Sequence, residues 1–437
     1  MIQRFFKDVV IYALPMFLAR AAGLLLLPIY TRQLGPADFG FVEFIAATST
    51  ILLLVLPLEI NQAVGRLLPE AENDRRKYKI ITTALWFTLA VFGSFGVLVY
   101  LSRFQWLEIL NLSSSYAQYT ALICFHFLIL AIVNLLQVKF RFTSQAKYSV
   151  TINMAIVVSN LALVLYFTSV NRLGVEQYFL SQILSGVVGI LIGLGVLIKQ
   201  YRTLPLFKNI DVQVLRELLK YSLPLVLSSI GVALTASIDR LMIGSNIGLV
   251  ELGYYGAAVR LSTIVSLGFY VISSAMTPMV YGEHEKPETR VLIAKVFQIT
   301  GYSSIALLII VTFYSELIIT LFAGVQFTAA SKYLFYLMLS AVIAGSYMFF
   351  LGMDIYKKTT ILSKINIISG VLGSVMCVAL VPVFGVWGAI ASTLLSNSLR
   401  ISGYVFFSQR LYKVPVFLWH FSLAIIFLII INILLKT

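Results

Sequence analysis

The sequence predicts an all-helical, polytopic membrane protein built from two pseudo-symmetric six-helix lobes and one additional C-terminal helix. Three observations predict this fold. First, the chain is 60% hydrophobic and 11% charged, whereas soluble domains are nearer ~45–50% apolar and ~25% charged. Second, the apolar residues recur in blocks of about twenty, the length of a helix that crosses ~30 Å of hydrocarbon. Third, Lys and Arg are concentrated in alternate loops, which indicates the orientation in the membrane. A short motif also occurs once in each half of the chain, which indicates internal symmetry.

Thirteen apolar segments are long enough to be membrane spans. The start, MIQRFFKDVVIYALP, lacks a small-residue cleavage site, so we expect the first span to serve as its own signal. A β-barrel is not expected, because barrel strands alternate in and out over about ten residues. The predicted spans are 9–31, 40–62, 80–101, 117–138, 149–169, 178–198, 221–243, 253–277, 291–313, 330–352, 365–384, 386–407 and 417–435.

The basic residues are distributed unevenly between alternate loops. The loops on one side of the predicted spans hold 23 Lys and Arg, and those on the other side hold six. Cytoplasmic loops are the ones enriched in Lys and Arg, so this bias places the N-terminus in the cytoplasm. It also accounts for the net charge of +14 without nucleic acid as a partner. We therefore expect a multi-pass membrane protein with a cytoplasmic N-terminus.

The two halves of the chain share sequence signals. YALP at 12–15 matches YSLP at 221–224, and RQLGPADFG after the first span corresponds to RLMIGSNIGLVELG after the seventh. Each copy has six spans, and because six is an even number both copies enter the membrane from the same face. We therefore expect a pseudo-two-fold axis along the membrane normal and a pathway between the copies. The predicted domains are lobes 1–198 and 221–407, a basic cytoplasmic linker 199–220 and an additional helix 408–437. The linker is either an amphipathic helix on the membrane surface or a solvated tether.

Three arginines inside predicted spans belong to neither set of loops. Arg20, Arg260 and Arg400 fall in spans one, eight and twelve. Each costs about 2.5–3.5 kcal/mol at mid-span on insertion scales, so each is expected to face protein or water. Arg20 has two interpretations, a cavity residue or a buried ion pair with Glu43. Arg400 is either a functional residue or a side chain that extends to the cytoplasmic boundary.

Helical spacing places several polar residues on common faces. Glu43 shares a face of span two with Thr50, Pro57 and Asn61, and Glu59 points to the opposite side, where we expect an interface. Asp239 ends a polar face of span seven and is either functional or part of a local ion pair with Arg240. These faces suggest a cavity walled by the first two helices of each half. The resulting candidates for cargo binding are Arg20, Glu43, Arg260 and Arg400.

The sequence contains no catalytic constellation, so we do not expect an enzyme. A nucleotide-binding P-loop would need GxxxxGK[ST], and no Gly-Lys pair occurs. The three histidines, at 126, 284 and 420, lack metal-ligand spacing. No cofactor is expected, and transport would have to use an ion gradient (H⁺ or Na⁺), the cargo gradient or coupling to partner proteins. Asn153 and Asn160 are expected to hydrogen-bond between helices.

The chain resembles the polysaccharide-transport branch of the multidrug/oligosaccharidyl-lipid/polysaccharide (MOP) exporter superfamily, which includes O-antigen flippases. The resemblance lies in LPIYTRQLGPADFGFVEF near the N-terminus, in SIDRLMIGSNIGLVELGYYGAAVRL from 237 to 261, and in the six-plus-six layout. It implies that a polyprenyl-pyrophosphate-linked oligosaccharide moves from the cytoplasmic to the outer leaflet of a bacterial inner membrane by alternating access. Membrane lipids, a polysaccharide polymerase and a chain-length regulator are the other implied partners.

The resemblance also suggests roles for individual residues. In related lipid II flippases, cavity arginines on the first and eighth helices attract the pyrophosphate, and Arg20 and Arg260 match these positions. Relatives bind sodium among helices seven, eleven and twelve, for which Asp239, Asn366 and Thr393 are the candidates. The expected second acidic ligand on helix eleven is not evident. The alternative function is an ion-coupled multidrug exporter of organic cations, which the three span arginines disfavour.

Overall fold

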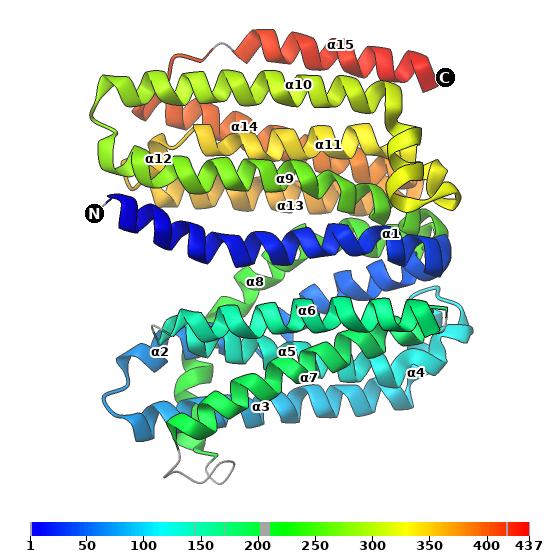
Figure 1. Cartoon of the computed structure of the whole chain (residues 1–437), viewed down its shortest axis with the longest axis vertical. Helices are drawn as coiled ribbons and strands as arrows, with labels where there is room; N and C mark the ends of the chain where they lie inside the picture. The colour runs from blue at the N-terminus through cyan, green and yellow to red at the C-terminus, as the bar shows by residue number, and fades with distance from the viewer. Residues whose placement is uncertain (1, 144, 171, 202–209, 417, 437) are drawn as a thin grey trace. The chain divides into compact units, whose positions relative to one another are not determined.

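The protein is described here from a computed structural model of the whole chain (Figure 1). The structure describes the backbone of residues 2–143, 145–170, 172–201, 210–416 and 418–436, and their side chains except those of 2–22, 146, 418–419 and 435–436. The regular elements in these ranges are all helices. The prediction of an all-helical polytopic membrane protein is confirmed.

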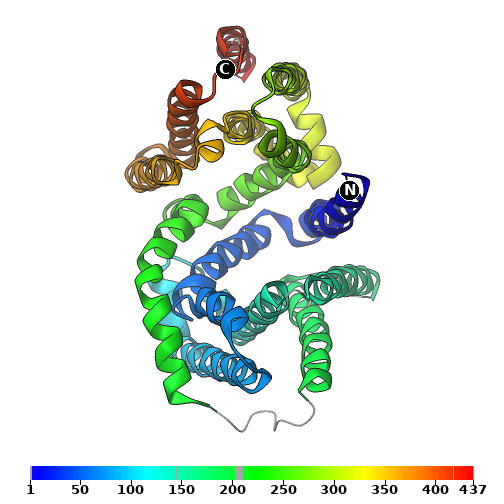
Figure 2. The same cartoon turned by 90° about the vertical axis from the view of Figure 1, so that its left-hand side faces the viewer.

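The chain forms two compact units. Unit 1 contains residues 1–34 and 41–241. Within it, α5 packs against α3, α6 and α7, and α6 packs against α7, as Figures 1 and 2 both show. The helices of unit 1 are α1 (Ile2–Val55, apart from residues 35–40), α2 (Ile60–Glu70), α3 (Asp74–Leu101), α4 (Arg103–Ile109), η1 (Ser114–Tyr119), α5 (Thr120–Phe142), α6 (Ala146–Val170), α7 (Val175–Gln200) and α8 (Val212–Asn246, to residue 241).

Unit 2 contains residues 35–40 and 242–437. Its main packing pairs are α13 with α14, α9 with α11, and α11 with α14, while α15 packs against α10. Its helices are α9 (Leu249–Glu283), α10 (Pro287–Ala323), η2 (Val325–Ala330), α11 (Ser331–Gly345), η3 (Ser346–Phe349), α12 (Gly352–Ile355), α13 (Thr359–Phe384), α14 (Val386–Leu411) and α15 (Leu418–Lys436). The two units are defined by which residues pack together, whereas the predicted lobes are defined by the sequence repeat. The lobe boundaries therefore stay a prediction.

The predicted spans fall on helices, with differences in detail. Among the described residues, ten helices are long and apolar enough to cross a membrane. The first two predicted spans merge into α1, whose backbone bends at Gly35 (φ 72°, ψ 170°). Helix α14 lies outside the set of ten, and α15 contributes only a shorter apolar stretch, His420–Leu434. The additional C-terminal helix is therefore present, and its packing partner is α10.

The second predicted span, 40–62, is wrong as a continuous helix. Helix α1 ends at Val55 and α2 begins at Ile60. Pro57 contributes to this break because proline has no N–H to continue the helix. The next two residues, Leu58 (φ 50°) and Glu59 (φ 57°), have left-handed backbone, which costs about 1–2 kcal/mol per non-glycine residue. The chain thus holds a strained turn between two helical segments.

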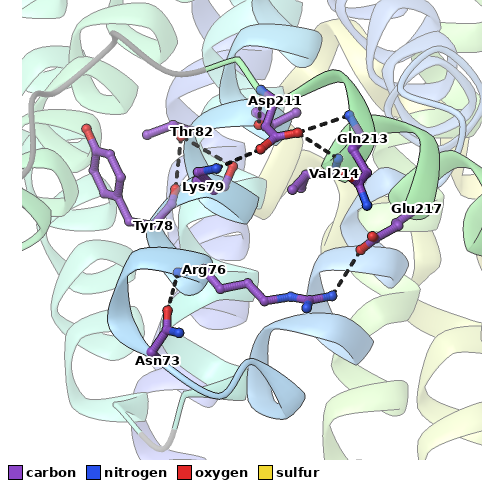
Figure 3. Close-up of polar contacts among 10 residues, drawn as sticks. Asn73, Arg76, Tyr78, Lys79, Thr82, Asp211, Gln213, Val214 and Glu217 are labelled. Atoms are coloured by element: carbon purple, nitrogen blue, oxygen red, sulfur yellow. Dashed lines mark hydrogen bonds and ion pairs between the residues drawn. The ribbon is translucent and has the colours of Figure 1, made fainter.

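The start of helix α8 is attached to α3 by polar contacts (Figure 3). Asp211 precedes α8, and its Oδ1 accepts hydrogen bonds from the backbone N–H groups of Gln213 (3.0 Å) and Val214 (3.3 Å). Its Oδ2 accepts a 2.8 Å hydrogen bond from Lys79 Nζ on α3. A second pair, Arg76 with Glu217, lies 3.1 Å apart. Polar contacts thus hold the first turns of α8 against α3.

The apolar side of this segment packs on protein. Val214 and Leu218 belong to a buried cluster with residues of α2, α3, α5 and α7, and Leu218 is fully buried. Residues 202–209 of the predicted linker lie outside the described residues. From Val212 onward, the linker is part of α8, and its buried side packs on the bundle. Its place at the membrane surface stays a prediction.

Replacing Asp211 with alanine is expected to lower the stability of the protein by about 0.5–2 kcal/mol, the usual cost of removing an N-cap. The hydrogen bond from Lys79, and then that from Val214 N–H, holds the pKa of Asp211 below its ordinary 3.8. A lowered folded-state pKa means that the carboxylate stabilises the fold above pH 3.8 and loses this effect as the pH falls through the folded pKa. Thermal unfolding in detergent should therefore give a higher melting temperature for the wild type than for D211A, and this difference in melting temperature should narrow below pH 3.8.

Glu217→Gln is the matched control for this prediction. It breaks the Arg76 ion pair, in which both side chains are about half exposed (53% and 41%), and such pairs contribute about 0–1 kcal/mol. An E217Q protein that loses as much stability as D211A would show that the cap at Asp211 has no special role.

Candidate functional site

The segment between the two predicted spans of α1 is fitted closely onto α9. Residues 35–40 belong to unit 2, although the residues on both sides of them belong to unit 1. A Cβ at Gly40 would lie 2.8 Å from the carbonyl carbon of Leu249, and a Cβ at Gly253 would lie 2.8 Å from that of Pro36. The carbonyl oxygens would be closer still. Two glycines thus allow the backbones of this segment and of α9 to touch.

This contact places an aromatic ring beneath Arg260. Phe39 is fully buried, and its ring packs edge-to-face on Phe327 (5.6 Å between centroids). Arg260 is half-buried on α9, with its guanidinium carbon 5.0 Å from the centroid of Phe39. A guanidinium within about 6 Å of a ring face is attracted by the electrons of that face. The ring therefore helps to hold a positive charge inside an apolar helix.

A second cationic cluster lies at Arg400 on α14. Arg400 donates a 2.9 Å hydrogen bond from Nη2 to Oδ1 of Asn397, whose amide donates in turn to Ser340 Oγ on α11 (2.9 Å). One turn further along α14, Tyr404 is buried and packs edge-to-face on Tyr347, which is 44% exposed. Within the described part of the chain, Arg400 is thus anchored by the neutral side chain of Asn397 and forms no ion pair with a carboxylate.

The buried acid Glu43 belongs to a separate ion pair. Glu43 is 3% exposed, and its Oε2 lies 3.7 Å from Nε of Arg240 on α8. Both residues are in unit 1. Arg240 lies on α8, which continues through it to Asn246. The predicted pairing of Glu43 with Arg20 is not tested, because the Arg20 side chain lies outside the described residues.

The three residues predicted for ion coupling lie in different surroundings. Asp239 is half-buried in unit 1, and its Oδ1 accepts a 2.8 Å hydrogen bond from the N–H of Arg240. Asn366 is exposed on α13 and donates to Tyr404 Oη (3.2 Å). Thr393 donates to the carbonyl of Ala389 in its own helix (2.9 Å). Asn366 therefore joins the Arg400 cluster through Tyr404. Among the described residues, no group of three or more His, Cys, Asp or Glu could hold a metal ion.

Sequence reasoning missed several residues of these clusters. Phe39 carried no visible signal, since it is one of many aromatic residues. Asn397 did carry one, because it precedes Arg400 by three residues and so shares its helical face. The expected interhelical role of Asn160 is confirmed, because Asn160 Nδ2 donates to Gln182 (2.9 Å) and its Oδ1 accepts from Tyr30 (3.2 Å).

The fold is that of a known class of membrane carriers. The lipid II flippase MurJ in an inward closed conformation superposes with a TM-score of 0.69 at 13% identity, covering 98% of both chains. An inward-facing multidrug resistance MATE transporter of the MOP superfamily gives 0.65 at 15% identity, over 90% of this chain and 95% of that one. The chain therefore has the MOP exporter fold.

The sequence comparisons narrow the class. The family described as polysaccharide biosynthesis protein matches residues 5–281, so the chain belongs to that family. The Lsg locus protein 1 of Haemophilus influenzae is 22% identical over an alignment of 406 residues that covers 89% of this chain and 96% of the relative. The chain therefore combines membership of the polysaccharide biosynthesis family with the fold of the MOP exporters.

Proposed function

We propose that this protein is a flippase that moves a polyprenyl-pyrophosphate-linked oligosaccharide, such as an O-antigen repeat unit, from the cytoplasmic to the outer leaflet. The observation that carries the proposal is Arg260, a guanidinium held on the ring of Phe39 within a membrane helix. A pyrophosphate is an anion that guanidinium groups bind with paired, charge-assisted hydrogen bonds. Membership of a polysaccharide biosynthesis family and the fold shared with a lipid II flippase support this cargo.

The cargo-binding residues follow from this proposal. Arg260 and Arg20 bind the pyrophosphate, and Arg400, held by Asn397, offers a further positive charge. Glu43 neutralises Arg240 and lines the sugar's path. The lipid tail stays in the bilayer while the polar headgroup crosses, so no covalent bond of the cargo changes. Asp239, Asn366 and Thr393 remain candidates for ion coupling.

The cellular setting follows from charge and cargo. The excess of basic residues in alternate loops supports an N-terminus in the cytoplasm of a bacterial inner membrane. A glycan delivered to the outer leaflet must then be joined to others, so a polymerase and a chain-length regulator are the partners that fit. Removing the protein from its native host should leave lipid-linked oligosaccharide on the cytoplasmic leaflet. An unchanged outer-leaflet supply would contradict the proposal.

A multidrug exporter of organic cations is the second candidate. The buried carboxylate Glu43 and the fold shared with MATE transporters favour it. The arginines in the spans oppose it, because like charges in a binding site repel a cationic drug. Overexpression that raises resistance to cationic dyes, with no effect on lipid-linked oligosaccharide, would favour the exporter over the flippase.

A further inference from the structure

An exposed tyrosine lies beside Arg400, just after α11 ends. Tyr347, on the short helix η3, is 44% exposed, and its ring packs edge-to-face on the buried ring of Tyr404, with 5.6 Å between the centroids. Both tyrosines interact electrostatically with Arg400. The contact therefore holds one exposed aromatic ring next to a guanidinium that the proposed function assigns to the cargo.

Hydrogen bonds fix the groups around this ring. The Asn366 amide on α13 donates from Nδ2 to Tyr404 Oη (3.2 Å), and Arg400 is held by Asn397 on its own helix (2.9 Å). Helix α13 packs against α14, and α14 also packs against α11 and η3. Three adjoining segments of unit 2 thus present an aromatic ring, an amide and a guanidinium in fixed positions.

These groups are open to the surroundings although they belong to a membrane protein. Asn366 is exposed on α13, and Arg400 is only half-buried on α14. A belt of interfacial aromatic residues would explain an exposed tyrosine by itself. It would not explain the amide and the guanidinium beside it, because polar and charged groups of membrane helices face protein or water and not lipid tails. Tyr347 is therefore part of a polar surface.

This set of groups matches the chemistry of a sugar ring that is linked to a phosphate. A pyranose ring has apolar C–H faces, which stack on the electron-rich face of an aromatic ring, and its hydroxyl groups exchange hydrogen bonds with an amide. A guanidinium binds phosphate oxygens. The first sugar of the proposed cargo is joined directly to the pyrophosphate, so it must lie beside the group that binds the phosphate.

From these observations we propose that Tyr347, Asn366 and Arg400 form a subsite for the first sugar of the lipid-linked oligosaccharide. The sugar ring stacks on the exposed face of Tyr347, the Asn366 amide hydrogen-bonds its hydroxyls, and Arg400 binds the adjacent phosphate. This inference rests on the proposed function and extends it, because it assigns recognition of the sugar to named residues of unit 2. For Asn366 it is an alternative to ion coupling.

One acid lies within electrostatic range of the subsite. Asp354 in α12 is half-buried and interacts with Tyr404, as Arg400 and Tyr347 do. Among the described residues, Asp354 forms no ion pair with Arg400. A carboxylate accepts hydrogen bonds from sugar hydroxyls, whereas it repels a further phosphate. Asp354 therefore favours a sugar over a second anion beside Arg400.

The test is binding to the purified full-length protein in detergent, measured by isothermal titration calorimetry. The probes are farnesyl pyrophosphate and its derivatives that carry glucose, galactose, N-acetylglucosamine or N-acetylgalactosamine on the pyrophosphate. We expect the wild type to bind at least one sugar-bearing probe about tenfold more tightly than farnesyl pyrophosphate. Tyr347→Ala should remove this preference, whereas Tyr347→Phe should keep it, because the ring and not the hydroxyl stacks on the sugar.

Tyr302→Ala is the matched control. Tyr302 is 63% exposed on α10 and its ring packs on Phe421, so Y302A should keep the preference for sugar. Equal affinities of the wild type for all probes, or an unchanged preference in Y347A, would overturn the subsite.

Two further arms separate the possible reasons for failure. Farnesyl pyrophosphate alone reports on the proposed function, because its binding should weaken in R260A whether or not a sugar adds affinity. Methyl glycosides of the same sugars distinguish a lipid-linked cargo from a free saccharide, and we expect them to bind far more weakly than the linked probes. A methyl glycoside that binds as tightly as its linked probe would overturn the assignment of this subsite to the cargo.

Discussion

Arg260→Ala is expected to reduce transport of a polyprenyl-pyrophosphate-linked glycan by about 10- to 100-fold, because a hydrogen bond to a charged group contributes about 1.5–3 kcal/mol and 1.4 kcal/mol is tenfold. Transport by Arg260→Lys should lie between that of the wild type and that of Arg260→Ala. Lysine keeps the charge but lacks the planar fork that binds two phosphate oxygens. Flipping by purified protein in liposomes, at matched protein content, measures the effect.

Arg290→Ala is the matched control for this prediction. Arg290 also lies over an aromatic ring in unit 2, with its guanidinium carbon 4.7 Å from the centroid of Tyr412. The side chain is exposed at the start of α10, outside the predicted spans, so R290A should transport normally. A fully active R260A together with a normal R260K would remove the assigned role of Arg260.

Gly253→Ala is expected to have the largest structural effect. The new Cβ would lie 2.8 Å from the carbonyl carbon of Pro36 and nearer to its oxygen, and backbone atoms cannot rotate away as a side chain can. We expect a loss of stability near the upper end of the 1–3 kcal/mol typical of overpacking. Transport should also be lost, because the segment that holds Phe39 beneath Arg260 would be displaced. Gly40→Ala, which meets the carbonyl of Leu249, should behave alike.

Gly268→Ala on the same helix provides the comparison. A Cβ at Gly268 meets nothing within 4 Å, and alanine favours a helix over glycine by about 1 kcal/mol. G268A should therefore melt at or above the wild-type temperature in detergent. Equal melting temperatures for G253A and G268A would show that the close backbone contact is not needed.

Much of the helical architecture could be predicted from hydropathy alone. The predicted span 80–101 ends where α3 ends, at Leu101, and the predicted span 365–384 ends with α13 at Phe384. The positions where helices begin were predicted less accurately. Helix α3 begins at Asp74, before the apolar run, because Asn73 accepts a hydrogen bond from the N–H of Arg76. A cap is a local polar signal, whereas hydropathy reports only the part of a helix in hydrocarbon.

The candidate sites were less predictable because they depend on contacts between distant residues. Periodicity placed Glu43 on a polar face but could not select Arg240 as its ion-pair partner. It placed Glu59 opposite that face but missed the strained turn at Leu58 and Glu59, although Pro57 is a sequence signal for a break. Helical faces follow from spacing, whereas pairings between helices follow from how those helices pack.

The central claim is that this protein moves pyrophosphate-linked glycans across a bilayer, and flipping in liposomes tests it most directly. Fluorescent polyprenyl lipids that carry the same sugar on a pyrophosphate or on a neutral linkage would be reconstituted with the protein, and a membrane-impermeant quencher would report the outer leaflet. We predict rapid exchange of the pyrophosphate-linked lipid, slow exchange of the neutral one, and loss of this difference in R260A. Equal exchange of both lipids, or none above protein-free liposomes, would contradict the account.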